Sequence, residues 1–553
     1  MLDASATVAG FRQLAPEHLR KSLESFLPRD ATREEKLGAI EAVLNSAIGQ
    51  ALRETMARWV VDEIVPAEAL VPEAYVKWRA PVRDSMVFVV THLSAGRLAP
   101  KLLEQIELPI STPPEMRLLR LIAKVPGLQK LGQVIARNQH LRPALRKALI
   151  RLENGIHDVT SENIRSIVER ELGSRMVKYA VQISSAILKE ASVSAVIRFS
   201  WRNPETELRE RGVLKVLKPY IPEYFAEDMN YLQGLAQHFG DRHHTYGFPL
   251  HLIPDTFRKV RRVLRHEVNF KREQKTLVEA AALYQRFPKV RVPQLIGPLC
   301  TRHITALTEE KGTKITTAVA QLSPDRRRKA TQQLLEALIA VPLFSAAPDA
   351  VFHGDPHAGN LLYNRRTGEL VIVDWALRER LDREQRRHLA LLFLMVSLRD
   401  PLGVSNEIYA LSQSTRQRNF VPLQVIRRAV CEFLRASGPS SIPSVADTMR
   451  LLENVALKGI KFPVSMIMLS KVVLTLEGTL GDIGGADTAF GFAIARQVAR
   501  HWLVNRSAYR SPIRGRDWVS LQCSALLLPA RLGLQIERAM LDRLLRRAPI
   551  ALA

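Results

Sequence analysis

The spacing of apolar and polar positions predicts a mostly helical chain with a few short strands. Helical spacing covers four stretches, residues 1–115, 116–172, 220–285 and 314–346. In the first stretch, proline-containing joints separate the predicted helices. Strand-like patterns appear in three places, residues 191–217, 290–308 and 361–373. The first of these predicts a hairpin, because strand-like runs lie on both sides of a polar turn at Asn203-Pro204.

The most informative segment runs from His353 to Asp374. The sequence His353-Gly354-Asp355-Pro356-His357-Ala358-Gly359-Asn360 precedes a short apolar strand, and a turn at Gly368 leads to a second strand that ends at Asp374. Asn360 follows Asp355 by five residues, and Asp374 follows it by 19. In a protein-kinase catalytic loop, Asn comes five residues after a His-x-Asp motif, and a metal-binding Asp comes after a short hairpin. The spacing therefore predicts a kinase-like loop and hairpin.

The chemistry of these residue types fits such a site. A loop of this length can direct the Asp355 carboxylate toward an attacking oxygen, while the side-chain oxygens of Asn360 and Asp374 bind Mg²⁺. Water and the nucleotide phosphates then supply the remaining oxygen ligands of this hard cation. An Asp before Pro is also a common turn former, and an Asn after Gly often caps a loop. A purely structural role therefore stays open as the alternative.

A kinase-like site also needs a strand lysine that contacts the nucleotide phosphates. Lys215 is the candidate, because alternation in residues 213–216 places it on the opposite face of the strand from its apolar neighbours. The alternative is an ordinary solvated lysine. Residues 191–195, which read Ala-Ser-Val-Ser-Ala, stand where a phosphate-covering loop belongs, although they lack the usual glycines.

The order of these motifs resembles the UbiB/AarF family of atypical kinases, which is associated with coenzyme Q biosynthesis. The family's KxGQ helix is matched by Lys130-Leu131-Gly132-Gln133, its Ala-rich loop by residues 191–195, its basic-Pro turn by Lys218-Pro219 and its ExD motif by Glu267-Val268-Asn269. Glu273, six residues after Glu267, matches the helix glutamate that orients the strand lysine. The resemblance runs from about residue 116 to residue 485.

The resemblance implies a set of site residues. Asp355, Lys215 and Glu273 form the expected catalytic group, and Asn360 with Asp374 form the expected Mg²⁺ site. The expected contacts to ATP or ADP come from Lys215, Ala191, Ser192, Val193, Ser194, Lys130, Gln133 and Glu267. Lys130 and Gln133 are further expected to fold over the nucleotide and to restrict substrate entry.

Three departures from the family pattern bear on activity. The DFG-type triad becomes Asp374-Trp375-Ala376, the second acid of ExD becomes Asn269, and Ser194-Ala195 replaces a Gly-Gln pair. Two hypotheses follow. The first is an ATP-dependent kinase or ATPase that acts on, or assists, a lipid or small-molecule pathway of the isoprenoid-quinone type. The alternative is a nucleotide-binding pseudokinase that serves as a scaffold without phosphoryl transfer.

The segment after Asp374 bears on the phosphoryl acceptor. Only seven residues separate Asp374 from Asp382, and the spacing of Asp382 to Gln385 predicts a helix cap. This leaves no room for a long activation segment, so peptide docking of the protein-kinase type is not expected. The expected partners are an adenine nucleotide, a lipid or isoprenoid small molecule, and proteins of a biosynthetic complex.

Charge and hydropathy add expectations about location. Lysine and arginine number 80 against 55 acidic residues, which gives a net charge of +25 and attracts polyanions. The chain has no zinc-finger spacing, basic-leucine heptad or RNP-type motif, so nucleic-acid binding is not expected. Residues 534–547 form a basic amphipathic pattern that predicts a helix, either packed on the protein or lying on an anionic membrane.

Other features favour the cytoplasm, with peripheral contact to the inner membrane as the further option. Spanning a bilayer takes about 18 or more consecutive apolar residues, and Lys471 interrupts the candidate at 462–476. The N-terminus shows no secretory signal, and three dispersed cysteines suit a reducing compartment.

The predicted fold is α+β, a two-lobed protein-kinase-like fold with additional helical segments at both ends. Its expected parts are an N-terminal helical region at 1–115, a KxGQ helical extension at 116–175, an N-lobe at 176–310 with a helical insert at about 220–262, a C-lobe core at 311–400, and a C-terminal helical region at 401–553. No function is assigned to the first part.

Overall fold

The computed structural model describes residues 30–71, 73–109, 111–136, 143–150, 158–247, 252–345, 347–413, 423–438, 443–483 and 512–547. The chain divides into two compact units, Met1–Phe270 with Gly297–Ala306, and Lys271–Ile296 with Leu307–Ala553. Each unit has its own apolar core. Helices predominate and the strands form small sheets, so the α+β class is confirmed. The five-part division expected from the sequence stays a prediction.

Within the described residues, the first unit begins with a helical region, as the apolar spacing predicted. The part of that prediction before residue 30 lies outside the described residues. The helices of this region are α3 (Arg33–Asn45), α4 (Ala47–Trp59), α5 (Ala67–Leu70), α6 (Arg79–His92), α7 (Ala95–Glu107), α8 (Pro114–Ile122), α9 (Pro126–Ala136) and α10 (Pro143–Ile150), with a π-turn at Val60–Ile64 and a 3-10 turn at Glu73–Trp78. Prolines begin several of them, because proline suits the first helical turn and disrupts a helix interior. Pro66 caps α5 and Pro113 caps α8.

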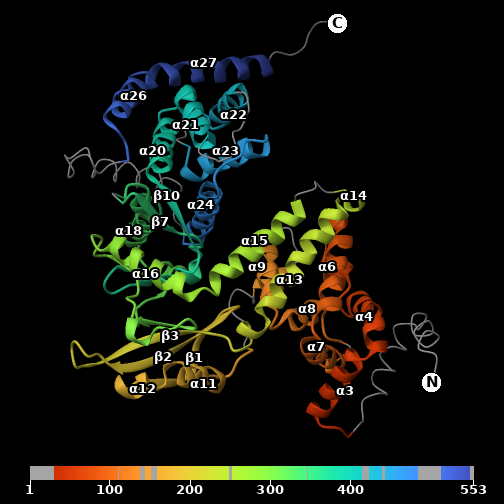
Figure 1. Ribbon diagram of the computed structural model, residues 1–553. Coiled ribbons are helices and arrows are strands. Elements are labelled where there is room, and N and C mark those ends of the chain that lie inside the picture. Colours follow the sequence, from red (N-terminus) through yellow and green to blue (C-terminus); the bar gives the residue numbers. More distant parts are fainter. Residues whose placement is uncertain are drawn as a thin grey trace, which may run out of the picture. The chain divides into compact units, whose positions relative to one another are not determined.

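A four-stranded sheet follows in the same unit, in the order β1-β2-β3-β5. Its strands are β1 (Gln182–Glu190), β2 (Ser194–Arg202), β3 (Arg209–Leu217) and β5 (Ile304–Thr308), and the short helices α11 (Ser161–Leu172) and α12 (Ser174–Lys178) precede it. Figure 1 shows α11 and α12 beside these strands. The antiparallel pair β2–β3 confirms the predicted hairpin. β1 was missed, because most of its residues are exposed and show no alternation of apolar and polar positions.

Three helices complete the first unit, namely α13 (Tyr220–Asp241), α14 (His243–Tyr246) and α15 (Leu252–Glu267). Their buried residues, such as Leu232, Leu235 and Leu264, share one apolar cluster with the helices that precede the sheet. The insert between the sheet and α16 therefore packs into the core of its own unit.

The second unit contains two small sheets, β10-β7 and β4-β9-β8-β6, and a set of helices. The strands are β4 (Val290–Arg291), β6 (Thr313–Lys314), β7 (Asp349–His353), β8 (Leu361–Asn364), β9 (Glu369–Ile372) and β10 (Arg378–Asp382). The helices are α16 (Phe270–Tyr284), α17 (Ile315–Ala320), α18 (Pro324–Leu335), α19 (Val341–Leu343), α20 (Arg383–Ser397), α21 (Pro401–Gln413), α22 (Leu423–Ala436), α23 (Val445–Leu457), α24 (Val464–Asp482), α26 (Gly515–Leu526) and α27 (Leu528–Arg547).

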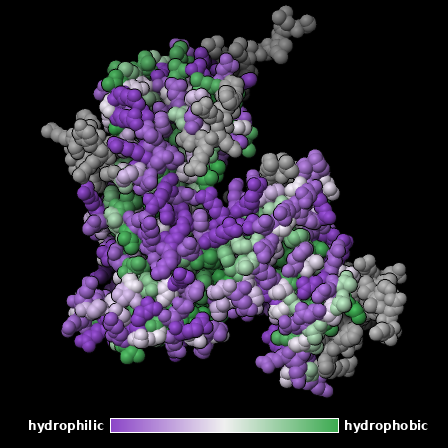
Figure 2. Space-filling model, viewed as in Figure 1, coloured by the Kyte–Doolittle hydropathy of each residue, from purple (hydrophilic) through white to green (hydrophobic). Residues whose placement is uncertain are grey.

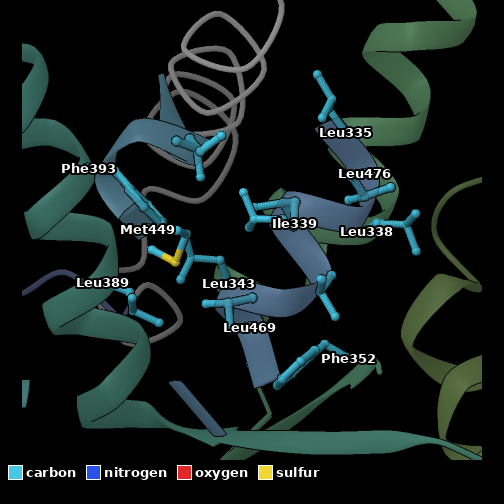
Figure 3. Packing of buried hydrophobic residues seen from close by; sticks show 14 of the residues in the cluster. Leu335, Leu338, Ile339, Leu343, Phe352, Leu389, Phe393, Met449, Leu469 and Leu476 are labelled. Carbon is cyan, nitrogen blue, oxygen red and sulfur yellow. The ribbon is translucent and has the colours of Figure 1, made fainter. Parts of the chain in front are cut away.

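One large apolar cluster holds the second unit together. Figure 3 shows ten of its labelled side chains packed against one another, Leu335, Leu338, Ile339, Leu343, Phe352, Leu389, Phe393, Met449, Leu469 and Leu476. They come from α18 through α19, β7, α20, α23 and α24. The core therefore joins the strands around residues 349–382 to helices far along the chain.

The pattern over 314–346 predicted one long helix, and this prediction is wrong. α17 ends at Ala320, and α18 begins at Pro324 with Ser323 at its N-cap. Pro324 occupies the first helical turn, where its missing N–H costs nothing, so the chain starts a new helix there. The predicted cap at Asp382 is confirmed, since Gln385 N donates to Asp382 Oδ1 at 2.8 Å at the start of α20.

Among the described ranges, α24 is the only helix that is by itself long and apolar enough to cross a membrane. Half of its apolar stretch is buried inside the protein. Two helical segments joined by a bend, Gly515–Leu526 and Leu528–Arg538, are long and apolar enough only when they are taken together. Leu469, Val473 and Leu476 of α24 are nevertheless buried in the core of the second unit, so packing alone accounts for its apolar character.

The C-terminal helices are fastened to the second unit by buried polar pairs. Asp517 of α26 accepts hydrogen bonds from Arg387 Nε and Nη2 at 2.7 and 2.5 Å, and Ser524 Oγ donates to Asp400 at 2.6 Å. Arg531 at the start of α27 donates to the carbonyl of Leu398 at 3.1 Å. This part of the helix pair packs on the protein itself. Farther along α27, Leu534, Ile536 and Met540 are 56%, 43% and 60% exposed, and Figure 2 shows green hydrophobic residues among purple ones over this region.

Replacing Asp517 with Ala is expected to loosen α26. Burial alone raises the pKa of Asp517, but hydrogen bonds from Arg387 and from the Arg514 N–H outweigh it and leave that pKa lowered. The stabilisation is therefore present above the unfolded pKa of about 3.9 and is lost as pH falls through the folded value. Arg387 would keep its 3.5 Å ion pair with the half-exposed Glu384, but losing its buried partner costs about 3 kcal/mol.

Hydrogen exchange at pH 7 measures this change directly. Amide protection in α26 should fall by about two orders of magnitude in Asp517→Ala, since 1.4 kcal/mol is a factor of ten in an opening equilibrium. Asp325→Asn on the exposed surface of α18 is the matched control and should leave protection unchanged. Equal protection in wild type and Asp517→Ala would show that the pair does not hold α26.

Candidate active site

The predicted catalytic loop follows β7 in the second unit. β10 pairs with β7, and Gly354 N donates to Leu377 O at 2.9 Å, which keeps the loop against the start of β10. His353 Nε2 lies 3.1 Å from Val373 O and 2.9 Å from Asp374 O, while Asp355 N donates to His353 Nδ1 at 3.2 Å. A ring that accepts at Nδ1 and donates at Nε2 is neutral. Burial lowers the pKa of His353 and favours this form.

Asn360 ties the loop to the end of β9. Its Nδ2 donates to Asp355 O at 3.2 Å, and Val373 N donates to Asn360 O at 3.0 Å. The side chain is buried, and its Oδ1 has no hydrogen-bond partner among the described residues. A buried acceptor without a partner costs about 1–3 kcal/mol. An amide oxygen without a hydrogen-bond partner can serve as a ligand of Mg²⁺, which prefers oxygen ligands. The residues present therefore fit the expected cation.

Asp374 adopts a backbone conformation that is rare outside glycine. Its φ is +61°, in the left-handed region. Asp and Asn tolerate this region better than other non-glycine residues, and strained residues of this kind gather at functional sites. The strain is held in place by the bond from His353 Nε2 to the Asp374 carbonyl.

Trp375, the departure from the DFG-type triad, is a core residue. Its side chain is fully buried, and Nε1 donates to Ile372 O at 3.1 Å. The indole also packs edge-on against His353, with ring centroids 4.9 Å apart. The residue after Asp374 therefore anchors the end of β9 in the apolar core and braces the histidine that holds the loop.

Lys215 lies on β3 in the first unit, opposite Val196 of β2. It is 9% exposed, and its Nζ lies 5.6 Å from the centre of the Phe270 ring. The alternative of a solvated lysine is therefore wrong. The Ala-rich segment forms the turn between β1 and β2, where Ala191 N donates to Ser194 O at 2.8 Å and Lys218 N donates to Val193 O at 3.0 Å.

A buried ion-pair cluster, which the sequence did not indicate, fixes this turn. Lys218 Nζ lies 2.7 Å from Asp158 and 2.8 Å from Glu190, the residue that precedes Ala191. Tyr220 donates to Asp158 at 2.9 Å. The basic-Pro turn of the motif thus has a structural role, since it holds both ends of the candidate phosphate-covering turn.

The KxGQ helix α9 is joined to α15 within the first unit. Lys130 forms an ion pair with Glu267, and both side chains are largely buried. Gly127 N donates to Asp228 at 3.2 Å, and a Cβ at position 127 would lie 2.3 Å from the Tyr231 hydroxyl, so a larger residue there would force the Tyr231 side chain to move. Gln133 belongs to α9 by its backbone, and its side chain lies outside the described part of the structure.

Glu273 lies in the first turn of α16 and is 2% exposed. It belongs to the second unit, whereas Lys215 belongs to the first. Their predicted ion pair therefore stays a prediction, as does the convergence of Lys130 and residues 191–194 on the loop of Asp355. What the structure brings together is Asp355, Asn360 and the end of β9 in one unit, and Lys130 with Glu267 in the other.

Sequence reasoning missed one charged neighbour of Asp355. Lys471 of α24 donates from Nζ to Asp355 Oδ1 at 3.2 Å. The only signal was the interruption of an apolar stretch by a lysine. Among the residues that the structure describes, no group of three or more His, Cys, Asp or Glu side chains is arranged to hold a metal ion.

Comparisons with known proteins agree with these motifs. Residues 151–408 match the family described as ABC1 atypical kinase-like domain. The probable protein kinase UbiB of Pasteurella multocida is 25% identical over 360 residues, which cover 63% of this chain and 67% of that protein. The uncharacterized protein sll1770 of Synechocystis is 25% identical over 436 residues, covering 76% and 71%. A solved structure of an Rv3197–erythromycin complex from Mycobacterium tuberculosis aligns with a TM-score of 0.42 and 13% identity, over 65% of this chain and 87% of that one.

The chain thus contains an atypical kinase-like domain of the ABC1 type. Together with the UbiB relatives, this match supports a divergent UbiB-family member, and the resemblance stated from the motifs is confirmed.

Proposed function

We propose that the protein binds a Mg²⁺–adenine nucleotide and transfers or hydrolyses its terminal phosphoryl group. The observation that carries the proposal is the open, buried Oδ1 of Asn360, in a loop hydrogen-bonded to the end of β9 next to Asp374. A fully structural asparagine in a loop would use its oxygen as well as its nitrogen. ATP or ADP is the expected ligand, as in the kinase-like family.

Each residue has a defined task in this proposal. Asn360 and Asp374 hold the cation, which when bound neutralises charge on the phosphates. Asp355 accepts the proton of the attacking hydroxyl or orients an attacking water. Lys215 binds the phosphates and Glu273 orients Lys215. Residues 191–194 cover the phosphates, while Lys130, Gln133 and Glu267 line the entry to the nucleotide.

The proposed acceptor is a lipid or small molecule, of the isoprenoid-quinone type that the family is associated with. Support comes from the chain after Asp374, where β10 and α20 follow directly and no long segment is available for peptide docking. The net charge of +25 and the exposed apolar residues of α27 support peripheral contact with an anionic membrane surface. Proteins of a biosynthetic complex are further proposed partners.

A nucleotide-binding pseudokinase is the second candidate, and one observation favours it. Ala376 stands where DFG-type kinases have their flexible glycine, and it is buried next to Trp375, which is fully buried beside His353. This segment is therefore fixed in the core here. Such a site can bind nucleotide and hold a shape without turnover.

Calorimetry and a turnover assay test the proposal together. Wild-type protein should bind ATP and ADP with Mg²⁺ and much more weakly with excess chelator. ATP should be turned over, and vesicles containing anionic lipid should raise the rate while zwitterionic vesicles do not. Binding without turnover under all conditions would favour the pseudokinase. Absence of Mg²⁺-dependent binding would overturn both candidates.

A further inference from the structure

Lys471 is a charged residue placed on the apolar helix α24, outside the region that matches the kinase-like family. Figure 3 shows Leu469 and Leu476 of the same helix among the core side chains, and both are buried. The Lys471 side chain is 34% exposed and that of Asp355 is 12% exposed. The leucines of this helix are therefore buried, while Lys471 lies at the edge of the core beside the catalytic loop.

The contact joins two positions 116 residues apart, with Lys471 Nζ 3.2 Å from Asp355 Oδ1. A partly exposed pair of this kind contributes little to stability. The Lys471 stem can lie along the apolar helix while its ammonium group reaches Asp355 at the edge of the core. A role in binding or chemistry explains the lysine better than a role in folding.

Other polar groups around the catalytic loop already have hydrogen-bond partners within the loop. His353 uses both ring nitrogens within the loop. Asn360 Nδ2 is used by the Asp355 carbonyl. Lys471 is a cation in contact with the Asp355 carboxylate, with Nζ 3.2 Å from Oδ1.

We propose that Lys471 binds the terminal phosphoryl group of the nucleotide while it is transferred. This inference rests on the proposed function. In the step, the bond between the terminal phosphorus and its bridging oxygen breaks and ADP leaves with that electron pair. The acceptor oxygen forms the new bond to phosphorus, and its proton passes to Asp355. In the bound nucleotide, one of the three ammonium donors stays on Asp355 and the others pair with oxygens of the terminal phosphoryl group. As the proton passes to Asp355, its hold on the ammonium weakens and the contact to the transferred group tightens.

The test compares nucleotides with and without the third phosphate. Lys471→Met should weaken binding of a non-hydrolysable ATP analogue about tenfold, the effect of losing one charged contact, while ADP affinity stays unchanged. Turnover should fall by about two orders of magnitude, as for loss of a donor to transition-state charge. Lys471→Arg keeps the charge and should recover most of both. Lys461→Met, at an exposed site just before α24, is the matched control.

Each outcome separates the inference from the function on which it rests. Equal loss of ATP-analogue and ADP affinity in Lys471→Met, or no change in either affinity or turnover, would overturn the role of Lys471 and leave the proposed function standing. Failure of the wild type to bind either nucleotide would overturn the proposed function itself. A circular dichroism melting curve identical to wild type establishes that the variant is folded, and Lys471→Arg serves the same comparison where the methionine variant unfolds.

Discussion

Replacement of Asp355 with Asn should abolish phosphoryl turnover while leaving nucleotide affinity nearly unchanged. Asn has the shape of Asp but cannot take a proton from the attacking oxygen, and loss of a general base costs about 10²–10⁴ in rate. The loop itself should keep its form, because the bonds that hold residue 355 to His353 and Asn360 use its backbone N–H and carbonyl. Steady-state turnover and calorimetry with Mg²⁺–ADP measure the two quantities separately.

The control for this substitution is Asp325→Asn, which removes an exposed carboxylate on α18. It should match the wild type in both measurements. Undiminished turnover in Asp355→Asn would show that this carboxylate is not the base and would move the assignment to another group. A parallel loss of nucleotide affinity would instead make Asp355 a binding residue.

Replacement of Asp374 with Asn should weaken Mg²⁺-dependent nucleotide binding at least about tenfold, because a metal ligand loses its charge. The substitution should leave the backbone of this segment unchanged. Residue 374 has a φ of +61°, and Asn tolerates the left-handed region as well as Asp does, so the backbone is not strained further. The bond from His353 to the carbonyl of residue 374 is also unaffected.

Titration of Mg²⁺ at fixed nucleotide, followed by calorimetry, measures this effect. The variant should need a higher Mg²⁺ concentration for half-maximal binding, and wild type and variant should become alike in excess chelator. Asp482→Asn at the exposed end of α24 is the matched control. Identical Mg²⁺ dependence of wild type and Asp374→Asn would reject Asp374 as a metal ligand.

Much of the candidate site could be predicted because it is local in sequence. Asp355, Asn360 and Asp374 lie within one loop and one hairpin, and the cap at Asp382 joins residues three positions apart. Turn lengths and backbone preferences operate over such short separations, so spacing alone indicates which side chains lie on the same loop or hairpin. The errors were local too, since a proline at the first turn of α18 divided a predicted helix and an exposed strand, β1, showed no alternation.

The sequence by itself determined the mixed helical and sheet character, the kinase-like loop, and the residue types that suit Mg²⁺ and phosphate. Only the tertiary structure decided that Trp375 is buried against His353, that Lys218 is neutralised by Asp158 and Glu190, and that Lys471 lies beside Asp355. These contacts join residues up to 116 positions apart. Such pairings are set by how apolar faces of distant elements pack into one core, and no short-range pattern along the chain records which faces will meet.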